Sequence, residues 1–377
     1  MKKRSMLKRT IFLSLVLLLS MSLVLSGCGS SSTGSTGGNT SNAGAASGGD
    51  DTVYTLKMNV HTADMVPPSI ATKIGCDKAT ELSDGRLQFD IYYSGNYVPY
   101  LDTFVGLSDD TIDMAMIDAT MIAGSFTLNQ AFSKPIKTGI PPRITTSEAY
   151  RTALAANPQF NEELSKVGVR WVSVGALAGY NIHMKSKVIT TPDDLKGQKL
   201  DSLGDAVGYF TAIGAPATAL DPGDSYQYIE KNLVDGQVSH WALLYNFDTL
   251  SLLNTHTIFG VDNIASESDG GLYAPLIGYA INESVWNSLP ADLQDILVEA
   301  FDYAGDEMAR MDEESIAAGK KVAVDRGDEF VFLTGDALKP WYDWADKTNQ
   351  EWFDACAAAG YDGEAAYNAI IAELGKK

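Results

Sequence analysis

The sequence predicts an α/β protein of two lobes joined by one long helix. Strand-like and helix-like segments alternate along the chain, a pattern typical of sheets covered by helices. Residues 51–377 are long for one compact core and sufficient for two lobes. A helical apolar stripe over residues 289–324 would exceed about 50 Å at roughly 1.5 Å per residue, and a helix of that length most naturally lies across two lobes.

The first elements form a strand, helix, strand unit. The segments "YTLKMNV" (54–60) and "RLQFDIYYSG" (86–95) are apolar or alternating runs bounded by turn residues, which indicates strands. Between them "SIATKIGCDKATELSDG" (69–85) spaces its apolar residues as a helix does and ends at Gly85. This order predicts a right-handed parallel crossover.

The same alternation continues along the chain. We predict helices at 100–110, 147–167, 205–213 and 224–232, and strands at 111–117, 169–175 and 237–243.

The segment "TTPDDLKGQKLDSLG" (190–204) has strong local signals. Thr191 is suited to cap a helical turn, Pro192 fits the first helical position, and Gly197 permits a left-handed stop. Residues 198–200 then enter a strand, so we expect Asp201 near its carboxyl end. In open parallel sheets, ligands bind beyond the carboxyl ends of the strands, which makes Asp201 a candidate ligand contact.

The long helix has its own start signals. Pro290 and Asp292 lie in its expected first turn. Gly305 is the position at which we would expect a kink if the helix did not run straight.

The amino terminus is typical of an exported protein. Five basic residues precede an uncharged apolar run from Thr10 to Leu25, which is too short for a comfortable membrane span. The following "LSGC" resembles the lipobox of bacterial lipoproteins, which implies a signal peptide at residues 1–27, cleavage before Cys28 and a lipid on its sulfur. Residues 29–50 are almost entirely Gly, Ser, Thr, Asn and Ala and predict a flexible tether after the lipidated Cys28.

The net charge of the chain limits the partners that the protein could bind. The chain has 28 basic and 48 acidic residues, a net charge of −20, and loss of the five basic residues before Cys28 makes this −25. So acidic a protein is a poor candidate for binding nucleic acid or anionic lipid.

Cys76 and Cys356 are the other cysteines, and the sequence leaves open whether they form a disulfide.

Enzyme and cofactor templates fit poorly. There is no HExxH, no Walker phosphate loop and no GxGxxG after a strand. The four histidines, His61, His183, His240 and His256, lack metal-ligand spacing. We therefore expect no catalytic residues, no metal and no cofactor.

Several segments together carry a family resemblance. They are "YTLKMNV", "ATELSDGRLQFDIYYSGN", "DDTIDMAMI", "TPDDLKGQKL", "IGAPATAL", "YQYIEKNLVDGQ" and "LPADLQDILVEA". In this order they resemble the solute-binding subunits of tripartite ATP-independent periplasmic (TRAP) transporters, of the DctP or dicarboxylate-binding type. The similarity extends from about residue 54 to 335.

The resemblance implies a two-lobed clamshell with a hinge of crossing strands and a long helix over both lobes. We expect lobe I to comprise residues 51–178 and about 266–304, and lobe II residues 179–265 and about 305–377. A small organic solute would enter the cleft between the lobes. The closed form would then dock on the permease subunits in the membrane.

Three positions depart from the family's usual chemistry. The strand after "DLKG" usually ends in an arginine that binds a solute carboxylate, and this chain has Asp201 there. Asn181 and Ser239 replace a second arginine and an asparagine. A carboxylate beside Asp201 would be repelled, so the departures favour a neutral polyhydroxy or cationic solute over a simple dicarboxylate.

The resemblance supplies candidate solute contacts, each with a structural alternative. The aromatic residues could belong to the core, Asn59 and Ser239 could bond only to the backbone, and His61 and Tyr100 could lie at the surface. Asp201 could instead form an internal salt bridge with Arg143, Arg151 or Arg170, leaving another cation to hold a carboxylate. The candidates are Asn59, His61, Tyr100, Asp118, Tyr180, Asn181, Asp201, Ser239 and Trp241.

The sequence therefore favours a lipid-anchored extracytoplasmic receptor that binds a solute reversibly and serves a secondary importer. Its expected partners are the solute, the permease subunits and the membrane, and nucleic acid is not among them. Alternatives are a binding protein for an ATP-driven importer, a secreted hydrolase, and a structural or sensory lipoprotein.

Overall fold

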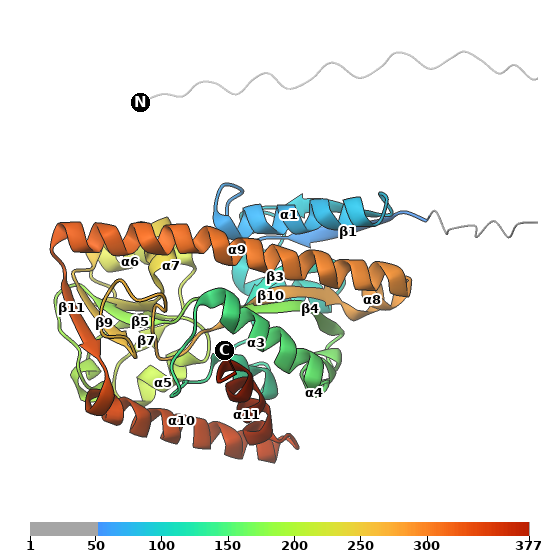
Figure 1. Ribbon diagram of the computed structural model, residues 1–377. Helices are drawn as coiled ribbons and strands as arrows, with labels where there is room; N and C mark the ends of the chain where they lie inside the picture. The colour runs from blue at the N-terminus through green and yellow to red at the C-terminus, as the bar shows by residue number, and fades with distance from the viewer. Residues whose placement is uncertain (1–51, 377) are drawn as a thin grey trace, which may run out of the picture. The chain divides into compact units, whose positions relative to one another are not determined.

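The computed structural model describes residues 52–376 of the chain (Figure 1). The predicted signal peptide, Cys28 and the tether lie outside the described residues and stay predictions. The described residues form two β-sheets with helices packed against them.

The first sheet belongs to the lobe that we call lobe I. β1 and β2 pair in parallel with α1 (Pro67–Leu82) between them, which confirms the predicted parallel crossover. β10 arrives from much later in the chain and runs antiparallel to both β3 and β4. In spatial order the strands are β2 (Leu87–Tyr92), β1 (Tyr54–Asn59), β3 (Met114–Asp118), β10 (Leu276–Asn282) and β4 (Val169–Ala176).

The second sheet belongs to lobe II. Its central strand β5 runs antiparallel to both of its neighbours, whereas the outer pairs are parallel. In spatial order the strands are β11 (Glu329–Leu333), β9 (Thr255–Phe259), β5 (Asn181–Met184), β8 (Gly236–Ser239), β6 (Leu200–Ser202) and β7 (Ala217–Thr218).

Shorter helices cover each sheet. Those of lobe I are η1 (Tyr100–Asp102), α2 (Thr103–Ser108), η2 (Leu128–Ser133), α3 (Arg143–Ala156), α4 (Gln159–Ser165) and α8 (Glu283–Ser288). Those of lobe II are η3 (Pro192–Leu195), α5 (Ala206–Ala212), α6 (Pro222–Glu230), α7 (Trp241–Asn246), η4 (Thr249–Leu252) and η5 (Gly335–Leu338).

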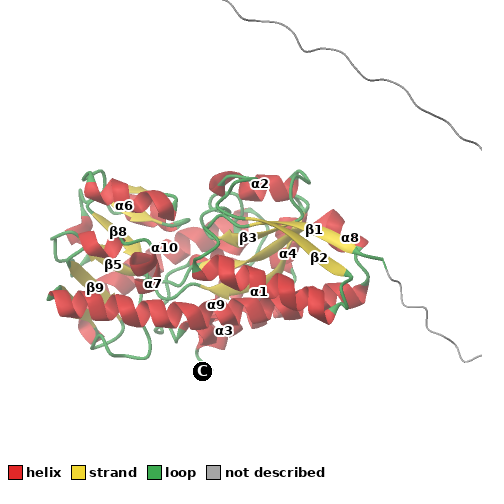
Figure 2. Ribbon diagram, turned by 90° about the horizontal axis from the view of Figure 1, so that it is seen from above, coloured by secondary structure: helices red, strands yellow, loops and turns green. Residues whose placement is uncertain are grey.

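The predicted long helix is α9 (Ala291–Arg326), and it runs unbroken through Gly305. It packs on α1 and β4 of lobe I and on α7 of lobe II. Figures 1 and 2 show it running along both lobes. Its apolar stripe therefore covers two cores in succession, which explains its unusual length.

A second helix, α10 (Lys339–Ala358), also connects the lobes. Near its start Trp341 Nε1 donates to Thr190 O of lobe II at 2.9 Å. Near its end Trp352 Nε1 donates to Thr127 O of lobe I at 2.7 Å. The last helix, α11 (Gly363–Leu374), packs on α3 and η2, so the end of the chain lies against lobe I although we predicted residues 305–377 for lobe II. An apolar stripe identifies a buried face but not the lobe that buries it.

Two chain segments cross between the lobes side by side. One joins β4 to β5 and the other precedes β10. Leu177 N donates to Pro275 O and Tyr180 N to Tyr273 O, both at 2.8 Å. These hydrogen-bonded crossings form the hinge that the family resemblance implies.

Some local predictions need correction. The helix expected at 147–167 is broken between α3 and α4 at Asn157 and Pro158, because a proline disfavours helical backbone in the residue before it. The strand expected at 237–243 ends at Ser239, and Trp241 begins α7. Cys76 and Cys356 are buried and free, so they form no disulfide.

Within residues 52–376, no helix combines the length and the apolar character that crossing a bilayer requires.

Candidate functional site

A cavity lies between the two lobes at the carboxyl ends of their strands. Lobe I supplies residues that end or follow β1 and β3, lobe II residues that follow β6 and β8, and α9 supplies one carboxylate. Its volume is about 60 Å³, well below the roughly 300 to 1,000 Å³ of ordinary small-molecule sites. Its polar lining residues are His61, Thr62, Asp118, His240, Asn246 and Asp312.

Asp118 is the best-organised acceptor in this cavity. It is the last residue of β3, and Tyr100 Oη donates to its two oxygens at 3.1 and 2.9 Å. Thr120 N also donates to Oδ1 at 2.8 Å, and His61 Nε2 lies 3.9 Å from Oδ2. The structure therefore brings three predicted contacts together at one carboxylate, with Tyr100 holding it from behind and His61 beside it.

The two histidines that line the cavity are uncharged near neutral pH. Burial lowers the pKa of His61, and nearby Asp118 opposes that change only in part. Burial, followed by the charge of Arg143, lowers the pKa of His240 to about 3. The Nδ1 atoms of both rings are buried, and no group of residues 52–376 forms a hydrogen bond with them. They add hydrogen-bonding atoms to the cavity but no positive charge.

Asp312 brings the second carboxylate to the cavity, and it is already paired. Its partner is Arg143 at the start of α3, and both side chains are almost fully buried. Arg143 Nε also donates to Ala176 O at 2.8 Å, whereas Nη2 is buried and finds no hydrogen-bond partner in the described part of the chain. Burial lowers the pKa of Arg143 to about 10, still far above neutrality, so the guanidinium stays charged.

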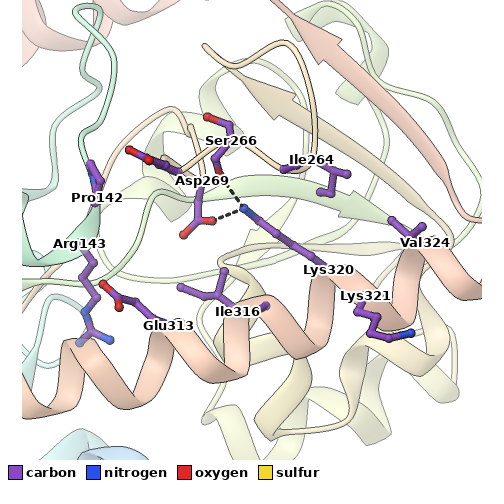
Figure 3. Close-up of a pocket in the computed structure, with 13 residues that line it drawn as sticks. Pro142, Arg143, Ile264, Ser266, Asp269, Glu313, Ile316, Lys320, Lys321 and Val324 are labelled. Carbon is purple, nitrogen blue, oxygen red and sulfur yellow. Dashed lines mark hydrogen bonds and ion pairs between the residues drawn. The ribbon is translucent and has the colours of Figure 1, made fainter.

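A larger hollow of about 450 Å³ lies between residues 264–269 and α9 (Figure 3). Lys320, a half-buried cation in its lining, already pairs with Asp269 at 2.6 Å. Arg143 lines this hollow, whereas its partner Asp312 lines the interlobe cavity. The Arg143–Asp312 ion pair therefore lies between the two spaces.

Asp201 occupies a different position from the one we predicted. It is the middle residue of β6, is almost fully buried, and is not among the residues that line the interlobe cavity. Ser225 Oγ and Gln237 Nε2 both donate to its Oδ2, at 2.6 and 2.9 Å. No ion pair within residues 52–376 includes Asp201, so the alternative salt bridges to Arg143, Arg151 or Arg170 are wrong. Its proposed contact with the solute stays a prediction.

Burial raises the pKa of Asp201 to about 6, although its three hydrogen-bond donors oppose the shift. A raised carboxyl pKa stabilises the fold below pH 3.8, and this contribution is lost as the pH rises toward 6. At about 1.4 kcal/mol per unit, the stability of Asp201→Asn relative to the wild type should increase by about 2 to 3 kcal/mol between pH 4 and 8. Urea unfolding at both pH values measures this difference. A constant difference would show that Asp201 is ionised as easily in the folded chain as in the unfolded one.

Two of the predicted amides have structural roles. Asn59 exchanges hydrogen bonds with the backbone of Val98, at 3.1 and 3.3 Å. Asn181 donates to Asp269 O at 3.0 Å and accepts from Phe259 N at 3.1 Å. Neither lines the cavity.

The remaining predicted contacts lie behind the cavity wall in lobe II. Trp241 is fully buried against His183 and His256, with both ring centroids 4.9 Å away. Ser239 Oγ and Tyr180 Oη are buried, and neither has a hydrogen-bond partner in the region that the structure describes. The Tyr180 ring lies 5.4 Å from that of His240.

Sequence reasoning missed His240, Asn246 and Asp312. His240 directly follows β8, so the rule that pointed to Asp201 could have found it. Asp312 lies on the buried face of α9, next to its apolar stripe. A buried carboxylate at such a position indicates that a polar or cationic side chain pairs with it. The partner, Arg143, is too distant in sequence to be identified from any local pattern.

Within the described part of the chain, no cluster of His, Cys, Asp and Glu could hold a metal ion. The cavity's chemistry is therefore that of hydrogen bonds and one unpaired carboxylate, with apolar walls from residues such as Met116, Leu203 and Phe247.

Known proteins similar to this chain are solute receptors. Residues 61–355 match the model of the bacterial extracellular solute-binding protein family 7, DctP. A solute-binding protein of Sulfitobacter sp. is 25% identical over 60% of this chain and 64% of its own length. The C4-dicarboxylate-binding protein DctB of Bacillus subtilis is 21% identical over 65% and 66%. The chain thus spans slightly less than two thirds of these relatives.

The fold is also similar to that of solved receptors. A TRAP solute-binding protein of Rhodoferax ferrireducens, in complex with copurified benzoate, has a TM-score of 0.73 at 20% identity, over 86% of this chain and 98% of its own. One from Roseobacter denitrificans with bound β-D-glucuronate has a TM-score of 0.70 at 13% identity, over 85% and 99%. These matches confirm the two-lobed fold. Because the family model covers most of the sequence, the chain belongs to family 7 of the bacterial extracellular solute-binding proteins, the DctP family.

Proposed function

We propose that this protein captures a small organic solute in the interlobe cavity and delivers it to the membrane subunits of a TRAP-type secondary transporter. The position of the cavity supports this, because a solute there would contact both lobes and the long helix. A solute that makes its full set of contacts only in the closed form stabilises that form. Closure about the crossing segments would then report occupancy to the transporter.

The proposed solute is a neutral polyhydroxy compound or a cation, and the lining of the cavity carries this proposal. Asp118 and Asp312 are its charged side chains, and no lysine or arginine of residues 52–376 lines it. Since Arg143 already neutralises Asp312, Asp118 is left as a carboxylate without a cationic partner. It can accept a hydrogen bond from an ammonium or a hydroxyl group, and it would repel an acid.

A carboxylate is the second candidate for the solute, and the buried cation Arg143 favours it. Its Nη2 is buried and has no hydrogen-bond partner among the described residues, and a solute oxygen could accept from it. The relatives named above that carry a ligand or a substrate name all bind acids. For this candidate, the acid would have to approach Arg143 in competition with Asp312.

The proposed location is the outer face of a membrane. The "LSGC" segment supports a lipid on Cys28, followed by the Gly- and Ser-rich tether of residues 29–50. The receptor would then stay near its permease while the tether allows it to reorient.

A screen of polyols, amines and carboxylates by thermal shift identifies the solute class, since a ligand of the folded form raises the melting temperature. We expect polyols or amines to raise it. Calorimetry with Asp118→Asn should then show affinity weaker by about 10- to 100-fold, the value of a hydrogen bond to a charged group. Asp102→Asn is the matched control, because Asp102 is exposed on the same lobe. If carboxylates alone raise the melting temperature, and both Asp118→Asn and Lys134→Met retain their affinity, the second candidate is correct, because Lys134 does not line this cavity.

A further inference from the structure

A separate pocket lies between the lobes, outside the cavity just described. Its walls come from η2 and the residues around it in lobe I, α5 in lobe II, and α10, which joins the two. It encloses about 410 Å³, within the usual range for small-molecule sites. The interlobe cavity and this pocket share no lining residue. Its lining includes Gln130, Lys134, Gly208, Tyr209, Trp344 and Trp352.

Lys134 places a buried ammonium group at the wall of this pocket. The residue is only 2% exposed, and no ion pair within residues 52–376 includes it. Its Nζ donates to Tyr209 Oη at 2.6 Å and to Gln130 Oε1 at 3.1 Å. An ammonium has three N–H donors, so one remains. Buried cations without a carboxylate partner are uncommon, because their charge is poorly compensated.

Aromatic rings surround this ammonium. Nζ lies 4.7 Å from the ring centroid of Tyr209 and 5.0 Å from that of Trp352, which gives cation–π contacts in place of an ion pair. Trp344 lies edge-on to Tyr209, with centroids 6.4 Å apart. The pocket therefore combines one positive charge with flat apolar walls.

From this combination we propose that the pocket is a second ligand site, which takes a small organic carboxylate with a flat apolar body. The carboxylate would accept the remaining N–H of Lys134, and the flat body would lie against Tyr209, Trp344 and Trp352. The ligand would contact both lobes and so favour the closed form. This site is independent of the solute that the interlobe cavity takes.

The other charged side chains near the pocket do not compete with a ligand carboxylate for Lys134. Lys347 and Glu351 form an exposed pair on α10, 3.9 Å apart, and largely cancel each other. Asp205 acts on Lys134 from beyond ion-pair distance, and burial raises the pKa of its carboxyl group. Burial also lowers the pKa of Lys134 to about 8, so the ammonium form still predominates at pH 7. A bound carboxylate would stabilise that form.

Calorimetry on the full extracytoplasmic chain with benzoate tests the site, with benzamide as the uncharged probe of equal shape. Benzoate should bind at least about 10-fold more tightly than benzamide, the effect of one charged hydrogen bond. Lys134→Met should remove that preference. Asp118→Asn should retain benzoate binding, because Asp118 lies in the other cavity.

Gly208 offers a second variant that removes no contact. A Cβ at this position of α5 meets nothing within 4 Å, so Gly208→Leu should take up part of the pocket without removing a contact, and Gly208→Ala is its matched control. We expect Gly208→Leu to weaken benzoate binding and Gly208→Ala to retain it. The proposal is overturned if wild type does not bind benzoate, if Gly208→Leu binds it as the wild type does, or if Asp118→Asn abolishes binding.

Discussion

Replacing Asp312 with alanine is expected to lower the free energy of unfolding by about 3 to 5 kcal/mol, the usual cost of removing one partner from a buried ion pair. The Arg143 and Asp312 side chains are 1% and 5% exposed. Without Asp312, the Arg143 guanidinium would remain charged in the protein interior. Among the described residues, Ala176 O would be the hydrogen-bond acceptor left to it. Urea unfolding at pH 7 measures the loss as a lower midpoint at an unchanged slope.

The same two helices provide a matched control. Arg151 of α3 and Asp306 of α9 are 2.8 Å apart, but their side chains are 16% and 28% exposed. Because water screens this pair, Asp306→Ala should cost about 1 kcal/mol or less. The double variant Arg143→Met/Asp312→Leu should recover much of the loss, since it leaves no buried charge. Equal losses for Asp312→Ala and Asp306→Ala would mean that water reaches Arg143.

The architecture could be predicted because its signals are local. The apolar stripe of α9 and the alternation in β1 and β2 reflect which face of each element is buried. The turn at 191–197 formed as predicted, with Thr191 N donating to Asp194 Oδ2 at 2.8 Å and Gly197 at φ +77°. Each of these features depends on neighbours a few residues away.

The site was predictable only where a polar residue ends or follows a strand. His61 and Asp118 meet that condition and lie in the cavity. For Asp201 the rule stays untested: β6 begins at Leu200, the carboxylate accepts a hydrogen bond from Ser225 of α6, and its contact with a solute stays a prediction. If a strand starts one or two residues earlier or later, different side chains lie at its carboxyl end. The sequence does not determine the start of a strand to within one or two residues.

Long-range pairing was beyond prediction for a different reason. Arg143 and Asp312 are 169 residues apart, and Lys134 meets Tyr209 across 75 residues. Nothing in the residues around Arg143 or Lys134 identifies the partner, because the contact exists only after both lobes and α9 are assembled. The family resemblance did not indicate these pairs either.

The second large effect is expected at the hinge, where Gly179→Ala should lower the free energy of unfolding by about 3 kcal/mol, the upper end of the usual cost of overpacking. A Cβ at Gly179 would lie 1.7 Å from Gly270 O, far inside van der Waals contact. The neighbouring atoms are backbone of the second crossing segment, so no side chain can turn aside. The segments would have to separate and lose bonds such as Tyr180 N to Tyr273 O.

The two crossing segments determine how the lobes meet. Gly179→Ala should therefore also bind the solute of the interlobe cavity more weakly, in proportion to the population of the closed form that it loses. Gly208→Ala is the control, because it adds a methyl group in open space within a helix and should leave stability unchanged or raise it by about 0.5 to 1 kcal/mol. Urea unfolding and calorimetry with the solute found by the screen measure both effects. If Gly179→Ala lost stability but kept full affinity, the crossing would be a rigid support, and closure would depend on other residues.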